Sequence, residues 1–329
     1  MKAVVKAGLP LIWVCGLFSC GTIAEGDGGD SNLPNRGITS FLPLDLGGGE
    51  EDMSPFVLFS ECCELSQPSP VLFGDELWLF MQSETEAGTE IWAATSEDGV
   101  VFSEPSPVFL PELAWEGAWI GAPTVVEDEG GLVMWYQADS VQSVLGLAHS
   151  VDGVTWQREV EPVLVDDFGV NGPSVARLDG EYRLYYYRYD PDSPEISGIF
   201  SASSAMGQVW TEPLLVLQPQ AGCTGETGEE QRCWDGDKIS SPGVRASVSQ
   251  TGRDLLDLWY TGGLGENTGI GFAGSFDGHS FVRYAENPVL DGDGPEAEAS
   301  VIEFRGRLMM YYSDELEGRR SIALANHQP

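Results

Sequence analysis

The sequence predicts an all-β protein built from repeats of one four-stranded unit. The main observation is a phrase that recurs as SEDGVVFSEPSPVFL from Ser96, SVDGVTWQREVEPVL from Ser150 and SFDGHSFVRYAENPVL from Ser275. A fourth form, SAMGQVWTEPLLVL from Ser204, lacks the Asp of the phrase. Recurrence at this scale is typical of a repeated structural unit.

Each unit is predicted to open with a β-hairpin. Small residues or Pro precede a short apolar run, a turn at Gly or Asp follows, and the chain resumes as an aromatic strand such as Tyr182–Tyr187. Turn residues between β-branched and aromatic runs are typical of hairpins. A third strand comes next, and the recurrent phrase then supplies a turn and a fourth strand. The five hairpins begin at Gln67, Ala122, Gly172, Ser241 and Glu298.

The Asp-Gly pair of the phrase has a structural interpretation. In SVDGVTW, Asp152 and Gly153 suit a tight turn with a positive φ at Gly, and Trp156 is predicted to pack between units. The copies with Phe102 and Phe281 have the same pattern. We therefore interpret the phrase as scaffold and not as a ligand site.

Five such units, at roughly 50 to 70 residues each, predict a five-bladed β-propeller, because twisted sheets can bury both faces by stacking around an axis. The fifth unit has no fourth strand before Pro329. The segment MSPFVLFSE, Met53–Glu61, resembles the fourth strands of the other units. We expect this N-terminal strand to complete the last blade and close the ring, which removes two exposed sheet edges. The propeller is expected over residues 53–329.

Residues 1–20 are predicted to be a lipoprotein signal peptide. Two lysines precede an apolar run too short to span a membrane, and Leu17-Phe18-Ser19-Cys20 resembles a bacterial lipobox, which predicts a lipid on Cys20. Ordinary secretion and an uncleaved anchor remain alternatives. Residues 21–52, rich in Gly, Asp and Pro, are predicted to be a flexible tether. We expect an exported protein anchored to the membrane by its lipid, in the outer membrane or the periplasm.

The charge of the chain excludes two classes of partner. Lys and Arg number 16 and Asp and Glu number 52, which gives a net charge of −36. Nucleic acids and anionic lipid surfaces require the opposite sign, so neither is an expected partner. Neutral sugars and cations remain compatible with this charge.

Four cysteines follow Cys20. Outside the cytoplasm they can oxidise, and they allow three pairings. We expect a Cys223–Cys233 disulfide that closes a polar loop and leaves Cys62 and Cys63 as a vicinal pair. A zinc site is the alternative, although the spacing lacks the paired CxxC pattern.

Candidate functional residues lie in the loops that lead from each fourth strand to the next first strand. In a propeller these loops gather at one end of the central channel, which we call the mouth. Trp can stack on the apolar face of a sugar, and carboxylates can bind hydroxyls or act as acid and base. The candidates are Glu61, Glu64, Trp115, Glu116, Trp119, Asp166, Asp167, Asn171, Trp234, Asp235, Asp237, Lys238, Asp291, Asp293, Glu296 and Glu298.

The blades with NPVL-type fourth strands and SxDGxxW-type turns resemble the five-bladed propellers of glycoside hydrolase families 43, 32 and 68 and the related mannoside phosphorylases. The resemblance covers about Met53 to Pro329. It implies an Asp base or nucleophile and a Glu acid beside the first strands. The Asp-Pro of blade one in these families falls on Gln67-Pro68, and the Glu-Gly-Pro acid motif on Asn171-Gly172-Pro173. Both side chains are amides, which neither ionise near neutral pH nor donate a proton as a carboxylic acid does.

These observations leave three hypotheses. In the first, the propeller hydrolyses a glycan, with Glu64 and either Glu296 or Asp237 as base and acid. In the second, it binds an oligo- or polysaccharide without cleaving it. In the third, it is a protein-interaction scaffold, which a mouth without a cluster of three carboxylates would indicate. No cofactor is expected, with Ca²⁺ at Asp235 or Asp291 as an alternative. The predicted substrate-binding residues are Gln67, Trp115, Glu116, Trp119, Asn171, Trp234, Asp235 and Glu298.

Overall fold

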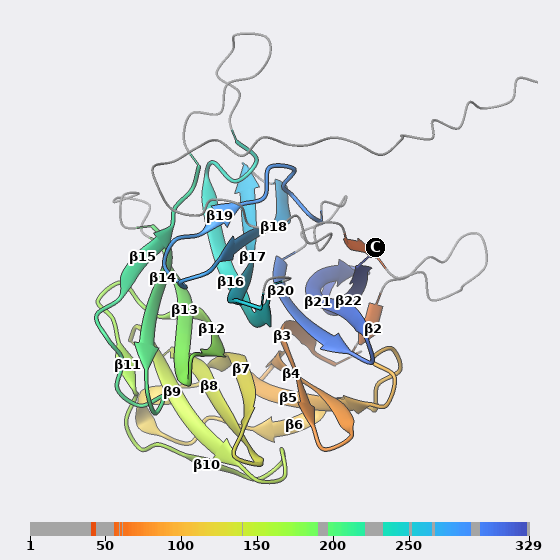
Figure 1. Cartoon of the computed structure of the whole chain (residues 1–329). Coiled ribbons are helices and arrows are strands. Elements are labelled where there is room, and N and C mark those ends of the chain that lie inside the picture. Colours follow the sequence, from red (N-terminus) through yellow and green to blue (C-terminus); the bar gives the residue numbers. More distant parts are fainter. Residues whose placement is uncertain are drawn as a thin grey trace, which may run out of the picture. The chain divides into compact units, whose positions relative to one another are not determined.

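The chain folds into five antiparallel sheets arranged as a ring of blades (Figure 1). The computed structural model describes residues 41–43, 56–58, 60, 62–139, 141–189, 197–220, 233–249, 252–264, 267–290 and 297–327. The helical segment in these residues is the short 3₁₀ turn η1, Ala114–Glu116. The predicted all-β, five-bladed propeller with four-stranded blades is confirmed.

In the first four blades the strands pair in the order in which they occur in the chain, except that β11 of blade 2 pairs with β9. The first strand of each blade lies nearest the axis of the ring (Figure 1). Blade 1 contains β3 (Glu64–Phe73), β4 (Glu76–Thr85), β5 (Gly88–Ser96) and β6 (Ser106–Phe109). Blade 2 contains β7 (Ile120–Asp128), β8 (Gly131–Asp139), β9 (Ser143–Ser150), β10 (Trp156–Arg158) and β11 (Leu164–Val165). Blade 3 contains β12 (Asn171–Leu178), β13 (Glu181–Arg188), β14 (Gly198–Ser204) and β15 (Leu214–Leu217). Blade 4 contains β16 (Lys238–Val248), β17 (Asp254–Leu264), β18 (Asn267–Ser275) and β19 (Val282–Arg283).

Blade 5 joins the two ends of the propeller. It contains β20 (Ala297–Phe304), β21 (Arg307–Leu316) and β22 (Arg319–His327), and β22 pairs with β2 (Phe56–Leu58) from the N-terminal side. The register places Phe56 opposite Ala323 and Leu58 opposite Ile322. The predicted closure of the ring by an N-terminal strand is therefore confirmed.

The propeller begins earlier than the sequence indicated. A further strand, β1 (Phe41–Pro43), pairs with the end of β22, and Phe41 lies opposite His327. The Phe41 ring is 2% exposed and meets Trp259 edge-on, with ring centroids 6.3 Å apart. The predicted tether over 21–52 is thus corrected at 41–43, because a short apolar segment inside a Gly-rich region completes the sheet. Blade 2 has the same arrangement, since β10 and β11 both pair with β9.

Residues 1–40, with the predicted signal peptide and Cys20, lie outside the described residues. Among the residues that are described, no helix has the length and apolar character needed to cross a membrane.

Hydrophobic contacts between blades form the core. Five clusters of buried side chains lie at the five junctions of the ring, and each draws residues from two neighbouring blades. Aromatic residues of the second strands, such as Trp135, Tyr185 and Tyr311, are completely buried there. Because every junction has its own cluster, each blade depends on both neighbours for burial.

The recurrent Asp-Gly turns fasten each blade to the one before it. Trp135 Nε1 donates to Gly207 O, in the copy without the Asp, at 2.9 Å, and Tyr311 OH donates to Gly99 O at 2.7 Å. At Gly153, which has φ of +77°, a Cβ atom would lie 2.8 Å from the Trp78 ring. The interpretation of the phrase as scaffold is supported by these contacts.

The Asp of the phrase stabilises the turn through its own backbone. Asp152 Oδ1 accepts hydrogen bonds from Thr155 N at 2.7 Å and Val154 N at 2.9 Å. These donors lower the pKa of Asp152 to about 2, because they favour the ionised carboxylate. In the fourth copy Met206 occupies this position, and the turn keeps the bond from Gly207 N to Ser204 Oγ at 2.8 Å.

We expect Met206→Asp to stabilise the protein, because it would supply the acceptor that the other copies have. The gain should be measured as the difference in free energy of unfolding from wild type. It should be fully present above pH 3.8, the ordinary value for Asp, and disappear as the pH falls through about 2, since a carboxyl with a lowered folded pKa stabilises only when ionised.

Met206→Ala is the control, since it removes the exposed Met side chain without adding an acceptor. Equal stability of the two variants at neutral pH would show that the Asp of the phrase does not stabilise the turn.

Candidate functional site

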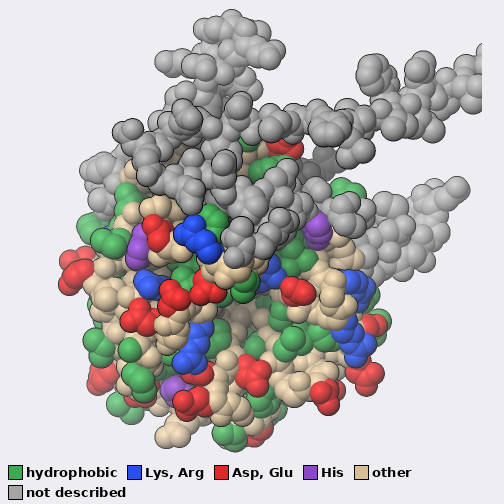
Figure 2. Space-filling view, in the orientation of Figure 1, with side chains coloured by type: hydrophobic (Ala, Val, Ile, Leu, Met, Phe, Trp, Pro, Cys, Tyr) green, Lys and Arg blue, Asp and Glu red, His purple; other side chains and the backbone are tan. Residues whose placement is uncertain are grey.

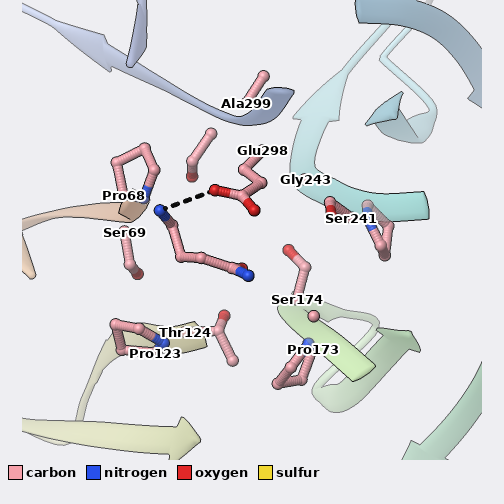
Figure 3. A pocket seen from close by; sticks show the side chains of 14 residues that line it. Pro68, Ser69, Pro123, Thr124, Pro173, Ser174, Ser241, Gly243, Glu298 and Ala299 are labelled. Atoms are coloured by element: carbon pink, nitrogen blue, oxygen red, sulfur yellow. Dashed lines mark hydrogen bonds between the residues drawn. The ribbon is translucent and has the colours of Figure 1, made fainter. Parts of the chain in front are cut away.

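A cavity lies at the centre of the ring, where the five first strands meet (Figure 3). Its volume is about 30 Å³, which is room for about two water molecules. Each first strand contributes a bulge, marked by a shift of register and a residue with positive φ. The bulge residues are Gln67 (55°), Ala122 (43°), Gly172 (51°), Ser241 (44°) and Glu298 (58°).

The bulges turn backbone N–H groups toward the preceding blade. Ala122 N donates to Gln82 Oε1 at 3.3 Å, and Gly172 N donates to Gln137 Oε1 at 2.9 Å. The same bond runs from Glu298 N to Thr261 Oγ1 at 2.9 Å and from Gln67 N to Ser313 Oγ at 3.0 Å. These hydrogen bonds explain why four of the five strained backbone positions persist around the cavity.

The hydroxyl groups of the lining have a second structural role. Ser69 Oγ accepts from Val125 N at 2.9 Å, Thr124 Oγ1 from Val175 N at 3.0 Å, and Ser174 Oγ from Val244 N at 2.9 Å. Each bond links one first strand to the next around the axis. Much of the polar lining therefore holds the ring together.

Glu298 is the ionisable residue among the fourteen that line the cavity. Its side chain is 10% exposed, and Oε1 lies 3.3 Å from Arg320 Nη2. Its Oε2 accepts from Ser313 Oγ at 2.7 Å and from Gln67 N at 3.2 Å (Figure 3). The structure thus brings together two predicted residues, Gln67 and Glu298, from opposite ends of the propeller.

Three other predicted carboxylates form buried clusters with Tyr and Arg. Glu116, with no exposed surface, accepts from Tyr136 OH at 2.7 Å and pairs with Arg158 Nη1 at 2.8 Å. Burial raises the pKa of Tyr136, and the hydrogen bond to Glu116 adds to this effect. Equivalent clusters join Asp166 to Tyr186 and Arg188, and Asp235 to Tyr260 and Arg283.

A fully buried carboxylate that is already paired has no surface to present to a sugar. Glu116 and Asp235 were predicted to bind substrate, but both are 0% exposed. Because the same cluster recurs in blades 2, 3 and 4, it attaches the loop before a first strand to the blade. We do not include these residues in the candidate site.

Two of the Trp residues predicted to bind substrate cover these clusters. Trp115 stacks on Tyr136, with centroids 6.2 Å apart and planes 20° apart, and its Nε1 donates to Val160 O at 2.9 Å. Trp234 lies over Tyr260 at 5.8 Å and 30°. Both rings are only partly exposed, as is Trp119, whose backbone bridges to Thr89. One face of Trp115 and one of Trp234 are therefore occupied by protein.

The remaining predicted residues are dispersed. Glu64 is partly exposed at the start of β3, opposite Glu84, and Asp237 is exposed before β16. Asn171 donates from Nδ2 to Tyr187 O at 3.2 Å, and its Oδ1 accepts from Gln137 Nε2 at 3.4 Å. Neither Glu64 nor Asp237 lines the cavity. Four of the predicted acidic residues, Glu61, Asp291, Asp293 and Glu296, lie outside the described residues.

The three cysteines that the structure describes are in disulfides. Cys62 and Cys63 form a vicinal disulfide, and Cys233 is also disulfide-bonded, while its predicted partner Cys223 lies outside the described residues. Within the described ranges no group of three or more His, Cys, Asp or Glu residues is arranged to hold a metal ion. The carboxylate of Asp235, named above as a Ca²⁺ alternative, instead pairs with Arg283 Nε at 2.9 Å.

Sequence reasoning missed three residues that lie behind the lining of the cavity, Arg320, Ser313 and Tyr187. Arg320 and Ser313 lie in blade 5, outside the loops that were searched, and both contact Glu298. Burial raises the pKa of Tyr187, and the nearby charge of Glu298 raises it further while Arg320 opposes the shift. An alignment of the five second strands would have identified Ser313 and Tyr187 as equivalent positions.

Known proteins resemble this chain in structure at low sequence identity. No protein-family model matches the chain, and no curated protein matches it. A thermostable family 43 glycoside hydrolase matches at 17% identity over 81% of this chain and 90% of that chain, with a TM-score of 0.66. The chain has the fold of the glycoside hydrolase propellers.

Two further structures support this fold. The β-1,2-mannobiose phosphorylase of Listeria innocua, solved with β-1,2-mannobiose, matches at 14% identity over 88% of this chain and 94% of that chain, with a TM-score of 0.64. A glycosyl hydrolase from Bacteroides ovatus matches at 18% identity over 90% and 93%, with a TM-score of 0.61. At this level of identity, what the chain shares with these structures is the propeller fold.

We expect Glu116→Ala to lower the free energy of unfolding by about 3–5 kcal/mol, because it leaves Arg158 and Tyr136 without their buried partner. Chemical denaturation measures this cost. Glu112→Ala is the matched control, since Glu112 is 70% exposed and lies 3.6 Å from the same arginine. Its loss should cost less than about 1 kcal/mol. Two variants of equal stability would contradict a structural role for Glu116.

Proposed function

We propose that the propeller binds a neutral glycan at the mouth of its channel without hydrolysing it. The observation that carries this proposal is the lining of the cavity, in which Glu298 is the one ionisable residue among the fourteen. Glycoside hydrolysis of the common type requires two carboxyl groups flanking the scissile bond. The bulges of blades 1 and 3, where the resembling families carry acidic motifs, present Gln67 and Asn171-Gly172.

The chemistry of the cavity suits sugar hydroxyls. Glu298 offers carboxylate oxygens, Arg320 offers N–H donors, and the Gln67 amide can donate and accept. Since Arg320 balances the charge of Glu298, the pair is neutral as a whole. The chain is strongly acidic, and its acidic side chains are spread among hydrophobic and basic ones on the surface (Figure 2). Such a surface is also compatible with an uncharged ligand.

Isothermal titration of the purified propeller with arabino-, xylo-, fructo- and manno-oligosaccharides tests this proposal. We expect binding to at least one series with no release of reducing ends. Glu298→Gln should weaken that binding roughly tenfold or more, because hydrogen bonds to a charged group are replaced by weaker ones. Hydrolysis that is abolished in Glu64→Gln or Asp237→Asn would overturn the non-hydrolytic assignment in favour of an enzyme.

A protein-interaction propeller is the second candidate. It is favoured by the same property of the described residues that disfavours hydrolysis, since no cluster of three carboxylates is found near the cavity. Failure of every oligosaccharide to bind would favour this candidate.

We also propose that the protein is a lipoprotein of the cell envelope, anchored through Cys20. The support is the lipobox-like sequence that follows a short apolar run. Cys20→Ser should move the protein from the detergent phase to the aqueous phase in a Triton X-114 partition of expressing cells. Cys15→Ser, which changes a cysteine inside the apolar run, should leave the partition unchanged. Equal partition of wild type and Cys20→Ser would contradict the anchor.

A further inference from the structure

The end of the propeller opposite the mouth is formed by two sets of turns, and we call it the turn face. Its turns centre on Gly99, Gly153, Gly207 and Gly278 of the recurrent phrase and on Gly74, Gly130, Gly180, Gly252 and Gly306 of the first hairpins. Strands alternate in direction within a blade, so each third strand runs from the mouth to this face, and β22 ends there at His327. β1 pairs with this end of β22, and Phe41 lies opposite His327 (Figure 1). The first described residues therefore lie at the turn face.

Phe41 is held there by the kind of contact that joins the other blades. At four junctions an aromatic ring of a second strand meets the ring of the next blade's recurrent phrase edge-on, in the pairs Phe80–Trp156, Trp135–Trp210, Tyr185–Phe281 and Tyr311–Phe102. Blade 5 has no such phrase among its described residues, and at this junction Trp259 meets Phe41 with planes at 83°. The point at which the N-terminal side of the chain joins the fold is therefore part of the core.

The position of Phe41 favours contact between the turn face and a membrane. Residues 21–40 separate Phe41 from Cys20, the proposed site of the lipid. A chain of this length spans at most about 70 Å. To bring the mouth to the bilayer, it would first have to pass along a blade, which is about 30 Å tall because β22 contains nine residues. The turn face reaches the bilayer without this detour.

Exposed aliphatic side chains stand at the tips of the turn face. They are Val101 (71%), Val151 (82%), Val154 (56%), Met206 (77%), Val209 (82%) and Val248 (57%). The first five belong to the recurrent turns of blades 1 to 3, and the sixth precedes the hairpin turn of blade 4. In the blade 2 turn, Asp152 accepts two backbone N–H groups and Ser150 Oγ accepts two more. Such a tip can enter an apolar layer without leaving these donors unpaired.

The charges of the turn face suit a zwitterionic lipid surface. Arg253, Arg305 and Arg307 are exposed on the hairpin turns of blades 4 and 5, where their guanidinium groups can contact lipid phosphates. The carboxylates of Asp98 and Asp152 lie on the recurrent turns of the same face. A bilayer whose headgroups carry both signs matches this mixture, whereas an anionic bilayer would repel a chain of net charge −36.

We propose that the turn face rests on a zwitterionic membrane surface, with the aliphatic tips of blades 1 to 3 in the headgroup region. This inference rests on the proposed lipid anchor at Cys20 and is independent of the proposed glycan. The anchor holds the protein at the bilayer, and the tips add apolar contact that sets its orientation. The mouth is therefore directed away from the membrane, toward the solvent from which a ligand arrives.

Val151 and Val141 give a matched pair of positions for the test. Both are exposed valines of blade 2, at 82% and 94%, but Val151 lies on the turn face and Val141 lies between β8 and β9 at the mouth end. Val151→Cys and Val141→Cys are made in the full lipoprotein, labelled with a thiol-reactive NBD dye and reconstituted with phosphatidylcholine vesicles. The native cysteines that the structure describes are in disulfides, and wild type taken through the same labelling measures the background.

Nitroxide-labelled phosphatidylcholine in the vesicles should quench the dye at position 151 by roughly half or more, since interfacial contact buries apolar side chains about 5–10 Å deep. The dye at position 141 should keep its emission. Equal quenching at both positions, or quenching at 141 alone, would overturn the orientation. No quenching at either position, in protein that floats with the vesicles, would show that the turn face does not touch lipid and is left for a protein partner. Protein that does not float with the vesicles would overturn the anchor, and the orientation with it.

Discussion

The N–H groups of the five bulges constrain the centre of this propeller. Each bulge turns its N–H out of its own sheet, where a buried donor without a partner would cost free energy. In four junctions the acceptor is a side chain of the preceding blade, so the acceptor reaches the donor only when neighbouring blades are in place. The bond from Gln67 N to Ser313 joins residues 246 positions apart. The shape of the cavity is thus a property of the closed ring and not of any single blade.

The strand pattern was predictable because short segments of the chain determine it. Turn residues, alternating apolar positions and the recurrent Asp-Gly phrase all act locally, and five copies reinforce one another. The strand β1 was missed for the converse reason. Phe41–Pro43 is three residues long in a Gly-rich region, and only its partners, His327 and Trp259, show that it belongs to a sheet.

The candidate site was less predictable because burial and pairing are not local properties. Glu116 has the sequence context of a mouth residue, but its partners Tyr136 and Arg158 lie 20 and 42 residues further along the chain. Glu298 was identified as a candidate, while Arg320, which balances its charge, lies on β22 and has no motif around it. A carboxylate in a loop can either hold the fold together or bind a ligand. The residues that surround it in the folded protein decide which of the two it does.

The last blade also imposes an order on folding. β22 pairs with β21 on one side and with β1 and β2 on the other, so its two neighbours come from opposite ends of the chain. β22 is the last of these strands in the chain, so until it is synthesised β1 and β2 have no partner strand and one edge of β21 exposes unpaired backbone groups. Contacts of such long sequence separation form slowly. The first strands to emerge during synthesis therefore wait for the last before they can pair.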